Sequence, residues 1–368
     1  MKKKLLLLIP FYFILVSISA CQNFSLVDKE ITSAINDSVF PGATILIGNE
    51  KEIIYKNSYG HFTYNKNSPP VQNNSLFDLA SVTKAFGTNF CVMKLVDENK
   101  LDINKPVAFY LPEFAVNGKE NVKVVDLLIH ESGLPPYYTP HEGETRKHIL
   151  DTIKTLPLAY PTNSKTVYSC LNFVTTMMVI ESIIKKPMYK FYADNFTTPL
   201  EMNRTMFKPD SNMRKYCVPT TPELQGIVHD PLARGLGGLS GNAGLFSTTE
   251  DLSKLCRLLL NKGVYNGKRI LSEKVVSFFT KRYSDRSTRA IGFDTKSDKH
   301  SSAGDYFSPG TYGHLGYTGT SIWIDPVRKI YAIFLTNRVY PDDTSSIRET
   351  RPKVYNAVIL SLEGKSEK

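Results

Sequence analysis

Apolar and polar positions alternate in a way that places strands near both ends of the chain and helices between them. Residues 26–39 carry apolar side chains on one helical face. Two β-rich runs follow at 43–48 and 52–59, with a short polar turn between them, and this arrangement predicts a hairpin. The chain then becomes polar and loop-like up to residue 76.

The middle of the chain follows a helical period. A helix is predicted from Ser81 to about Glu98, and further helical segments are predicted at 122–130, 141–155, 171–184, 188–195, 250–260 and 273–279. The stretch between 197 and 250 is rich in loops.

The strand pattern returns after residue 310. Residues 314–324 and 329–337 predict paired strands, and 353–362 predicts a closing helix. Strands at both ends with helices between them predict an α/β (α+β) fold. We expect an antiparallel sheet built from about 40–60 and 310–340, flanked by helices, with an inserted and mostly helical lobe of about 85–300.

The first twenty residues differ from the rest. Lysines at 2–4 precede an apolar run over 5–19, which is short for a membrane span and indicates a signal peptide of residues 1–20. The Ile-Ser-Ala-Cys sequence ending at Cys21 resembles the lipobox of bacterial lipoproteins, in which the cysteine becomes a lipidated N-terminus. This implies a mature chain of residues 21–368, exported to the bacterial cell envelope and anchored to a membrane. The alternative is plain secretion, with Cys21 incidental.

Composition and charge narrow the set of partners. The 368 residues are 42% hydrophobic and 22% charged, which is ordinary for a globular protein. Removal of the first twenty residues leaves 42 basic and 35 acidic residues, a net charge of +7. This excess is spread out, so it suits anionic envelope surfaces and does not indicate a nucleic-acid partner. We expect a monomer.

Cysteine and histidine spacing gives no sign of a cofactor. The five cysteines form no Cys-x-x-Cys pair and no Cys/His cluster, so we expect no metal site and no cofactor. Cys91 and Cys256 lie in apolar helical patterns, which predicts buried free thiols.

Ser81 and Lys84 are the first candidates for chemistry. Residues three apart at the start of a helix lie on one face, so the lysine amine would sit beside the serine hydroxyl. A lysine whose pKa is lowered can take the serine proton, and the helix N-terminus offers N–H groups to an oxyanion. On their own, the same residues are more typical of an N-cap serine followed by a solvated lysine.

Five segments, taken in their order along the chain, favour the catalytic interpretation of Ser81 and Lys84 over the N-cap interpretation. They are Phe77-Asp-Leu-Ala-Ser-Val-Thr-Lys84, the 124–135 segment ending in His-Glu-Ser-Gly-Leu-Pro, Tyr168-Ser-Cys170, Gly241-Asn-Ala-Gly-Leu-Phe-Ser-Thr248 and Gly313-His-Leu-Gly-Tyr-Thr-Gly-Thr320. Together they resemble the serine β-lactamase and penicillin-binding protein superfamily over nearly all of the mature chain. The resemblance is greatest to the branch of class C β-lactamases, D-Ala-D-Ala carboxypeptidases and esterases.

The resemblance implies a role for each motif residue. Ser81 attacks a carbonyl and forms an acyl-enzyme, and either Lys84 or Tyr168 takes the serine proton, a choice that the sequence leaves open. The backbone N–H groups of Ser81 and Tyr317 would hold the oxyanion. Gly316 would keep its strand free of a side chain where the substrate lies.

Two positions depart from the family pattern. His314 stands where many members have lysine; it could contact a substrate carboxylate or polarise Tyr168, but it is charged only below about pH 6.5 unless perturbed. Cys170 stands where an asparagine would bridge Lys84 and the substrate, and a thiol is a weak donor. The histidine argues mildly against a potent β-lactamase, because a fixed positive charge would help bind the substrate carboxylate.

These observations predict a serine hydrolase that works by acyl-enzyme transfer on amide or ester substrates. Peptidoglycan-like D-amino-acid peptides or β-lactams in the cell envelope are the expected substrates, so the partners are a small molecule or peptide and the membrane. One alternative is an esterase of small acyl substrates. The other is a catalytically inactive member that binds a ligand as a sensor.

Overall fold

The sheet at the centre of the protein joins the two ends of the chain. The computed structural model describes residues 23–284 and 286–365. The sheet strands are β1 (Gly42–Asn49), β2 (Ile53–Gly60), β8 (Asp294–Thr295), β9 (Tyr312–Leu315), β10 (Ser321–Asp325) and β11 (Ile330–Thr336). All neighbours are antiparallel, in the order β2-β1-β11-β10-β9-β8. Because β1 pairs with both β2 and β11, the predicted hairpin and the predicted sheet from both chain ends are confirmed.

One predicted strand is in fact two. Residues 314–324 were expected to form a single strand, but the chain turns over 316–320 between β9 and β10. The Gly316 N–H donates to the Thr320 carbonyl at 2.7 Å and closes the turn. Gly319 lies inside it with φ of +107°, a conformation that favours glycine. A β-rich composition does not reveal such a tight reversal, so the single-strand prediction was wrong here.

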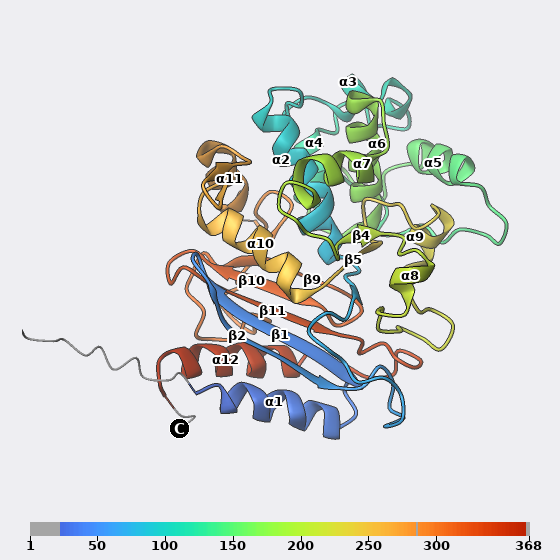
Figure 1. Cartoon of the computed structure of the whole chain (residues 1–368). Coiled ribbons are helices and arrows are strands. Elements are labelled where there is room, and N and C mark those ends of the chain that lie inside the picture. The colour runs from blue at the N-terminus through green and yellow to red at the C-terminus, as the bar shows by residue number, and fades with distance from the viewer. Residues whose placement is uncertain (1–22, 285, 366–368) are drawn as a thin grey trace, which may run out of the picture.

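Two helices cover one face of the sheet. They are α1 (Ser25–Asn36) and α12 (Thr350–Leu362), which lie side by side below the strands in Figure 1. The buried face of α1 consists of Val27, Ile31 and Ala34, which follow the helical period that the sequence shows. Because α1 and α12 come from opposite ends of the chain, the core beneath the sheet also joins both termini.

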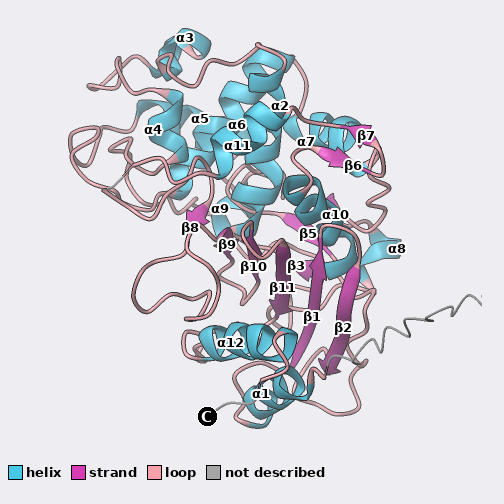
Figure 2. Ribbon diagram, turned by 90° about the vertical axis from the view of Figure 1, so that its left-hand side faces the viewer, coloured by secondary structure: helices cyan, strands magenta, loops and turns pink. Residues whose placement is uncertain are grey.

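The other face carries α10 (Thr249–Leu260), which packs on β1 and β11, and beyond it the helical lobe (Figure 2). The lobe and its connections contain α2 (Asn89–Asp97), α3 (Val107–Tyr110), α4 (Val124–Leu128), α5 (Arg146–Thr155), α6 (Cys170–Ile184), α7 (Met188–Tyr192), α8 (Ser211–Arg214), α9 (Pro231–Gly235) and α11 (Glu273–Thr280). Short strands are β3 (Phe77–Asp78), β4 (Met206–Phe207), β5 (Leu245–Ser247), β6 (Val264–Tyr265) and β7 (Lys268–Arg269). The predicted α+β architecture with an inserted helical lobe is confirmed.

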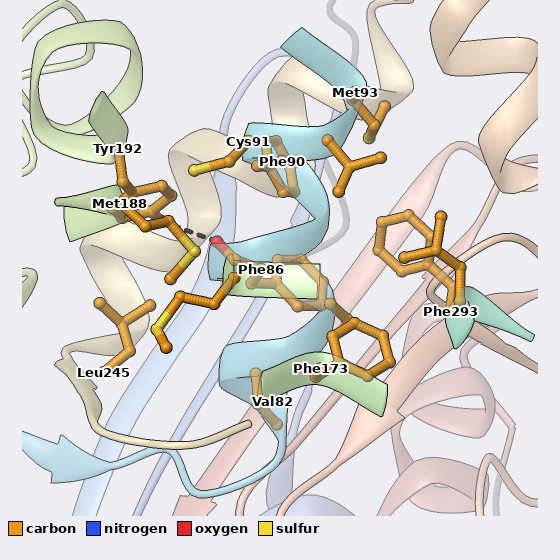
Figure 3. Close-up of a cluster of buried hydrophobic side chains, with 14 of the residues drawn as sticks. Val82, Phe86, Phe90, Cys91, Met93, Phe173, Met188, Tyr192, Leu245 and Phe293 are labelled. Carbon is orange, nitrogen blue, oxygen red and sulfur yellow. Dashed lines mark hydrogen bonds between the residues drawn. The ribbon is translucent and has the colours of Figure 1, made fainter. Parts of the chain in front are cut away.

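The helix predicted from Ser81 begins with a wide turn. Lys84–Thr88 has π-helical geometry, and α2 continues from it. Figure 3 shows Phe86, Phe90 and Phe293 gathered around this turn, with ring centroids 6.0 and 5.9 Å from Phe86. The Tyr192 hydroxyl donates to the Phe86 carbonyl at 2.8 Å. Single π turns occur frequently at functional sites, and here the turn starts at Lys84.

The predictions for the N-terminus fall on residues that the structure does not describe. The signal peptide of residues 1–20 and the lipidation site Cys21 lie outside the described residues. Across residues 23–284 and 286–365, no helix combines the length and apolar character needed to span a bilayer. Cys91 and Cys256 are buried free thiols, as predicted.

Candidate active site

Ser81 is presented by a tight turn between β3 and the π-helical turn. The preceding residue, Ala80, has φ of +45°, a left-handed conformation that residues other than glycine seldom adopt. The Asp78 carboxylate accepts a hydrogen bond from the Ala80 N–H at 2.8 Å and stabilises this conformation. Burial raises the pKa of Asp78 to about 6. The turn places Ser81 on the wall of a cavity.

Lys84 is fully buried beside the serine. Its Nζ lies 2.9 Å from Ser81 Oγ, 2.9 Å from the Asn242 carbonyl oxygen and 3.5 Å from Cys170 Sγ. These three acceptors match the three N–H bonds of an ammonium group. From the sequence alone, the Asn242 segment is only similar to the family. Its role here is to supply a carbonyl acceptor for Lys84.

The direction in which the pKa of Lys84 is shifted argues against Lys84 as the base that takes the serine proton. Burial acts to lower this pKa, but the interactions with Cys170, Tyr168 and Asp230 outweigh it, and the net pKa lies above the ordinary lysine value. The lowered pKa that a lysine base requires is therefore not found, and Lys84 is an ammonium group near neutral pH.

Tyr168 lies at the mouth of this cluster and is 37% exposed. Its ring centroid is 5.0 Å from Lys84 Nζ and 5.7 Å from Arg289 Cζ, so two cations flank the ring. The ring of His130 lies 4.5 Å away on the side of the protein interior. His130 Nδ1 accepts a hydrogen bond from the Ser169 N–H at 3.1 Å, which fixes the turn that carries Tyr168.

His314 is neutral near physiological pH. Burial first, then the charges of Arg289 and Lys84, lower its pKa to about 3. Its Nδ1 lies 2.8 Å from the Leu315 carbonyl oxygen, which can only accept, so we assign the proton to Nδ1. Near neutrality His314 therefore carries no positive charge with which to attract a substrate carboxylate. Its predicted contact with a substrate carboxylate or with Tyr168 stays a prediction.

Two residues that line the cavity have backbone N–H groups available for a ligand. Among the described residues, neither the Ser81 N–H nor the Tyr317 N–H donates a hydrogen bond within the protein, and both residues line the cavity. The side chains of Thr318 and Thr320 donate to the carbonyls of residues 78 and 79 at 2.7 and 2.9 Å. These two bonds fix the spacing between the N–H groups. Such a preorganised pair of donors can bind an oxyanion.

Gly316 is required for the close packing of the β9–β10 turn. A Cβ atom at this position would lie 2.0 Å from Thr320 Oγ1 and 2.5 Å from the Leu79 carbonyl oxygen. The absence of a side chain therefore lets the β9–β10 turn approach the backbone that precedes Ser81. Gly316 also lines the cavity, so its expected role in leaving the strand free of a side chain beside the substrate stays a prediction.

The cavity has a volume of about 970 Å³ and is rich in arginine. Arg289, Arg338, Arg348 and Arg351 line it together with Ser81, Tyr168, His314 and Tyr317. Arg289 is only weakly paired, with its nearest carboxylate in Asp294 at 3.9 Å. The sequence analysis missed these arginines, because they come from loops and from the start of α12, where no motif marks them. In the part of the chain that the structure describes, no group of three or more His, Cys, Asp or Glu residues is arranged to hold a metal ion.

The fold and this cluster together define a class of protein. The β-lactamase family model matches residues 27–354, and the chain belongs to this family. It is a β-lactamase-related serine hydrolase. Five of the predicted active-site residues line one cavity: Ser81, Tyr168, His314, Gly316 and Tyr317. Lys84 lies behind them in contact with Ser81 and with Cys170.

The individual relatives share less than a third of their aligned residues with this chain. The chain is 31% identical to an N-acetylmuramyl-L-alanine amidase of Bacillus subtilis over 341 residues, covering 81% of this chain and 77% of the relative. It is 31% identical to a putative D-alanyl-D-alanine carboxypeptidase of Salmonella gallinarum over 369 residues, covering 88% and 84%. A penicillin-binding protein homologue from Caulobacter crescentus has the same fold, with a TM-score of 0.75, 19% identity and coverage of 92% of this chain and 97% of that one.

Proposed function

We propose that this protein hydrolyses an amide bond in carboxylate-bearing peptides of the peptidoglycan type, through an acyl-enzyme on Ser81. The observation that carries the proposal is the 2.9 Å contact between Lys84 Nζ and Ser81 Oγ, on the wall of a large cavity. A buried ammonium beside the hydroxyl stabilises negative charge on Oγ as its proton leaves.

The geometry supports a definite order of steps. Ser81 Oγ attacks the substrate carbonyl carbon, and the N–H groups of Ser81 and Tyr317 stabilise the oxyanion. With Lys84 as an ammonium group, its nitrogen has no lone pair for the serine proton. We assign that proton to the Tyr168 oxygen, which accepts it as the phenolate and becomes the neutral phenol. The C–N bond then breaks, the proton passes from Tyr168 to the leaving amine, and water releases the acyl group from Ser81 in a second round.

Arg289 supports a substrate that carries a carboxylate. With His314 neutral, the cation on the cavity wall beside Tyr168 is Arg289, which pairs with Asp294 only at 3.9 Å. Guanidinium groups bind carboxylates with two parallel hydrogen bonds. We therefore propose that Arg289 binds the substrate carboxylate that a lysine in the third motif would bind.

Cavity size and similarity favour a peptide over a small ester. A volume of about 970 Å³ is near the upper end of the roughly 300–1,000 Å³ range of ligand pockets, so the site has room for more than one small acyl group. The relatives are named for amide substrates, one an N-acetylmuramyl-L-alanine amidase and the other a putative D-alanyl-D-alanine carboxypeptidase.

A covalent probe tests the proposal. We expect a fluorophosphonate to add one mass shift to the peptide containing Ser81, with no shift in a folded Ser81→Ala control. The same preparation should then be assayed on a D-Ala-D-Ala peptide, an N-acetylmuramyl peptide, nitrocefin and a p-nitrophenyl ester. Turnover of either peptide supports the proposal. Turnover of the p-nitrophenyl ester alone indicates an esterase, and absence of the adduct indicates a ligand-binding sensor.

We also propose that the protein is a lipoprotein of the cell envelope, anchored through Cys21. The support is the sequence pattern of residues 1–21. In a bacterial host, the wild-type protein should sediment with membranes, whereas Cys21→Ser should be recovered in the soluble fraction. Equal distribution of the two proteins would exclude the anchor.

A further inference from the structure

Arg351, in the first turn of α12, is a buried cation without an acidic partner. Only 8% of the surface of Arg351 is exposed to solvent. Within the described residues, no carboxylate oxygen lies within 4.0 Å of its guanidinium nitrogens. Burial lowers its pKa to about 10, so it remains protonated near neutral pH. A buried charge of this kind is costly unless hydrogen bonds compensate for the lost water, so its contacts need an explanation.

Those contacts go to the β9–β10 turn. Arg351 Nη2 donates to the Gly316 carbonyl oxygen at 2.8 Å and to the Thr320 carbonyl oxygen at 3.0 Å. The Gly316 carbonyl belongs to the same peptide group as the Tyr317 N–H. In a trans peptide the C=O and N–H bonds point in opposite directions, so a donor that holds the oxygen also fixes the direction of the N–H.

The charge has a second effect on this peptide group. A cation that donates to a carbonyl oxygen polarises the amide, and linked hydrogen bonds strengthen one another. The Tyr317 N–H therefore becomes a stronger donor. Because this N–H has no acceptor among the described residues and its residue lines the cavity, the gain is available to a bound oxyanion.

We propose that Arg351 is a positioning residue that orients and polarises the oxyanion-binding N–H of Tyr317. The inference rests on the proposed function, because it requires an acyl-enzyme on Ser81. It extends the active site to the helix that packs on the opposite side of the sheet from the helical lobe. In this inference Arg351 acts on the reaction through the peptide group that links Gly316 and Tyr317.

The neighbouring arginine provides a matched control. Arg338 donates from Nε and Nη2 to the Tyr317 carbonyl oxygen at 3.1 and 2.8 Å. That oxygen belongs to the next peptide group, whose N–H is that of Thr318 and not of Tyr317. Removal of Arg338 therefore loosens the same turn without removing the charge from the oxyanion-binding peptide.

The experiment measures the strength of the oxyanion site directly. Wild type, Arg351→Met, Arg351→Lys and Arg338→Met are acylated on Ser81 with a slowly hydrolysed ester that carries a ¹³C-labelled carbonyl, and the carbonyl stretch is recorded by infrared difference spectroscopy. We expect Arg351→Met to move the stretch to higher wavenumber, with Arg351→Lys between it and wild type and Arg338→Met close to wild type. We also expect kcat of Arg351→Met to fall about tenfold or more with little change in KM.

The outcomes separate this inference from the function on which it rests. A wild-type protein that forms no adduct on Ser81 overturns the proposed function and this inference with it. An adduct whose carbonyl stretch is the same in wild type and Arg351→Met overturns this inference alone. If Arg351→Met does not fold, Arg351→Lys decides, because a lysine lacks the planar fork and should still shift the stretch.

Discussion

Lys84 Nζ donates to Cys170 Sγ across 3.5 Å, at the first residue of α6. An asparagine in this position would accept from the lysine through its oxygen and still offer an N–H₂ group to the substrate. A thiol does neither well. The contact shows that the departure from the family pattern lies beside the nucleophile and not at the edge of the site.

We therefore expect Cys170→Asn to improve catalysis. A hydrogen bond of this kind contributes about 1 kcal/mol, which corresponds to a rise of about fivefold in kcat/KM for an amide substrate. Steady-state kinetics on a D-Ala-D-Ala peptide measure the effect. Cys170→Ala is the control, because it removes the thiol and adds no amide. Equal activity of the asparagine and alanine variants would show that the position does not contact the substrate.

The buried histidines should make the protein sensitive to acid. The pKa values of His130 and His314 are both lowered by burial, so the folded protein binds fewer protons than the unfolded chain below about pH 6.5. Stability is therefore lost as the pH falls from about 6.5 toward the folded-state value, by roughly 1 kcal/mol per pH unit for each imidazole.

Replacement of one histidine isolates this effect. Urea unfolding at pH 7, 6 and 5 should give a smaller loss of unfolding free energy for His314→Gln than for wild type. The raised pKa of Asp78 acts in the opposite direction, but it is present in both proteins and cancels in the comparison. His141→Gln, at an exposed position, should behave like wild type. Identical slopes for wild type and His314→Gln would contradict the predicted burial of a neutral imidazole.

The sequence was informative where local pattern and motif order carry the structure. The hairpin of β1 and β2, the apolar helix α6 and the Ser81-x-x-Lys84 spacing all follow from residues close together in the chain. Their order along the chain was enough to identify the family. These features depend on periodicity and on side chains that share one helical face, and both are visible in a sequence.

Features that depend on burial or on distant contacts were not predictable. The raised pKa of Lys84 comes from Cys170 and Tyr168, which share one segment, and from Asp230, which the fold brings to Lys84 from another. The low pKa of His314 results from burial beneath Arg289 and Lys84. Arg351 contacts the oxyanion turn from α12, and no local pattern marks that contact.

The state of Lys84 gives a prediction for the pH dependence of the reaction. Because its pKa is raised above 10.5, the ammonium persists through neutral and mildly alkaline pH. If Tyr168 takes the serine proton, Tyr168→Phe should lower the rate of Ser81 acylation about 100-fold or more. In wild type, acylation that needs the ammonium should decline only above about pH 10.5. Rapid-quench labelling from pH 6 to 11 measures both. A Tyr168→Phe protein that is acylated at the wild-type rate would instead identify Lys84 as the base.

Arg289 should discriminate between charged and neutral substrates. The guanidinium forms a charge-assisted bidentate contact with a carboxylate, and such contacts contribute about 1.5–3 kcal/mol. We expect Arg289→Gln to lower kcat/KM by about 10- to 100-fold for a peptide with a free C-terminal carboxylate. The same peptide with an amidated C-terminus is the matched substrate, and its kcat/KM should change little. An equal loss on both peptides would assign Arg289 a role in catalysis or folding and not in carboxylate binding.

Gly316 should tolerate no side chain. A Cβ atom would lie 2.0 Å from Thr320 Oγ1 and 2.5 Å from the Leu79 carbonyl oxygen, and the second of these is backbone that cannot move without displacing the segment before Ser81. We expect Gly316→Ala to lower the unfolding free energy by about 1–3 kcal/mol and to abolish acylation of Ser81, because the two oxyanion donors are pushed apart. Thermal unfolding and fluorophosphonate labelling measure these effects. Gly87→Ala is the control: its Cβ would meet its nearest atom at 3.5 Å, so this variant should fold normally and react with the probe. A Gly316→Ala protein that is labelled at the wild-type rate would show that the close approach of the turn is not needed for the reaction.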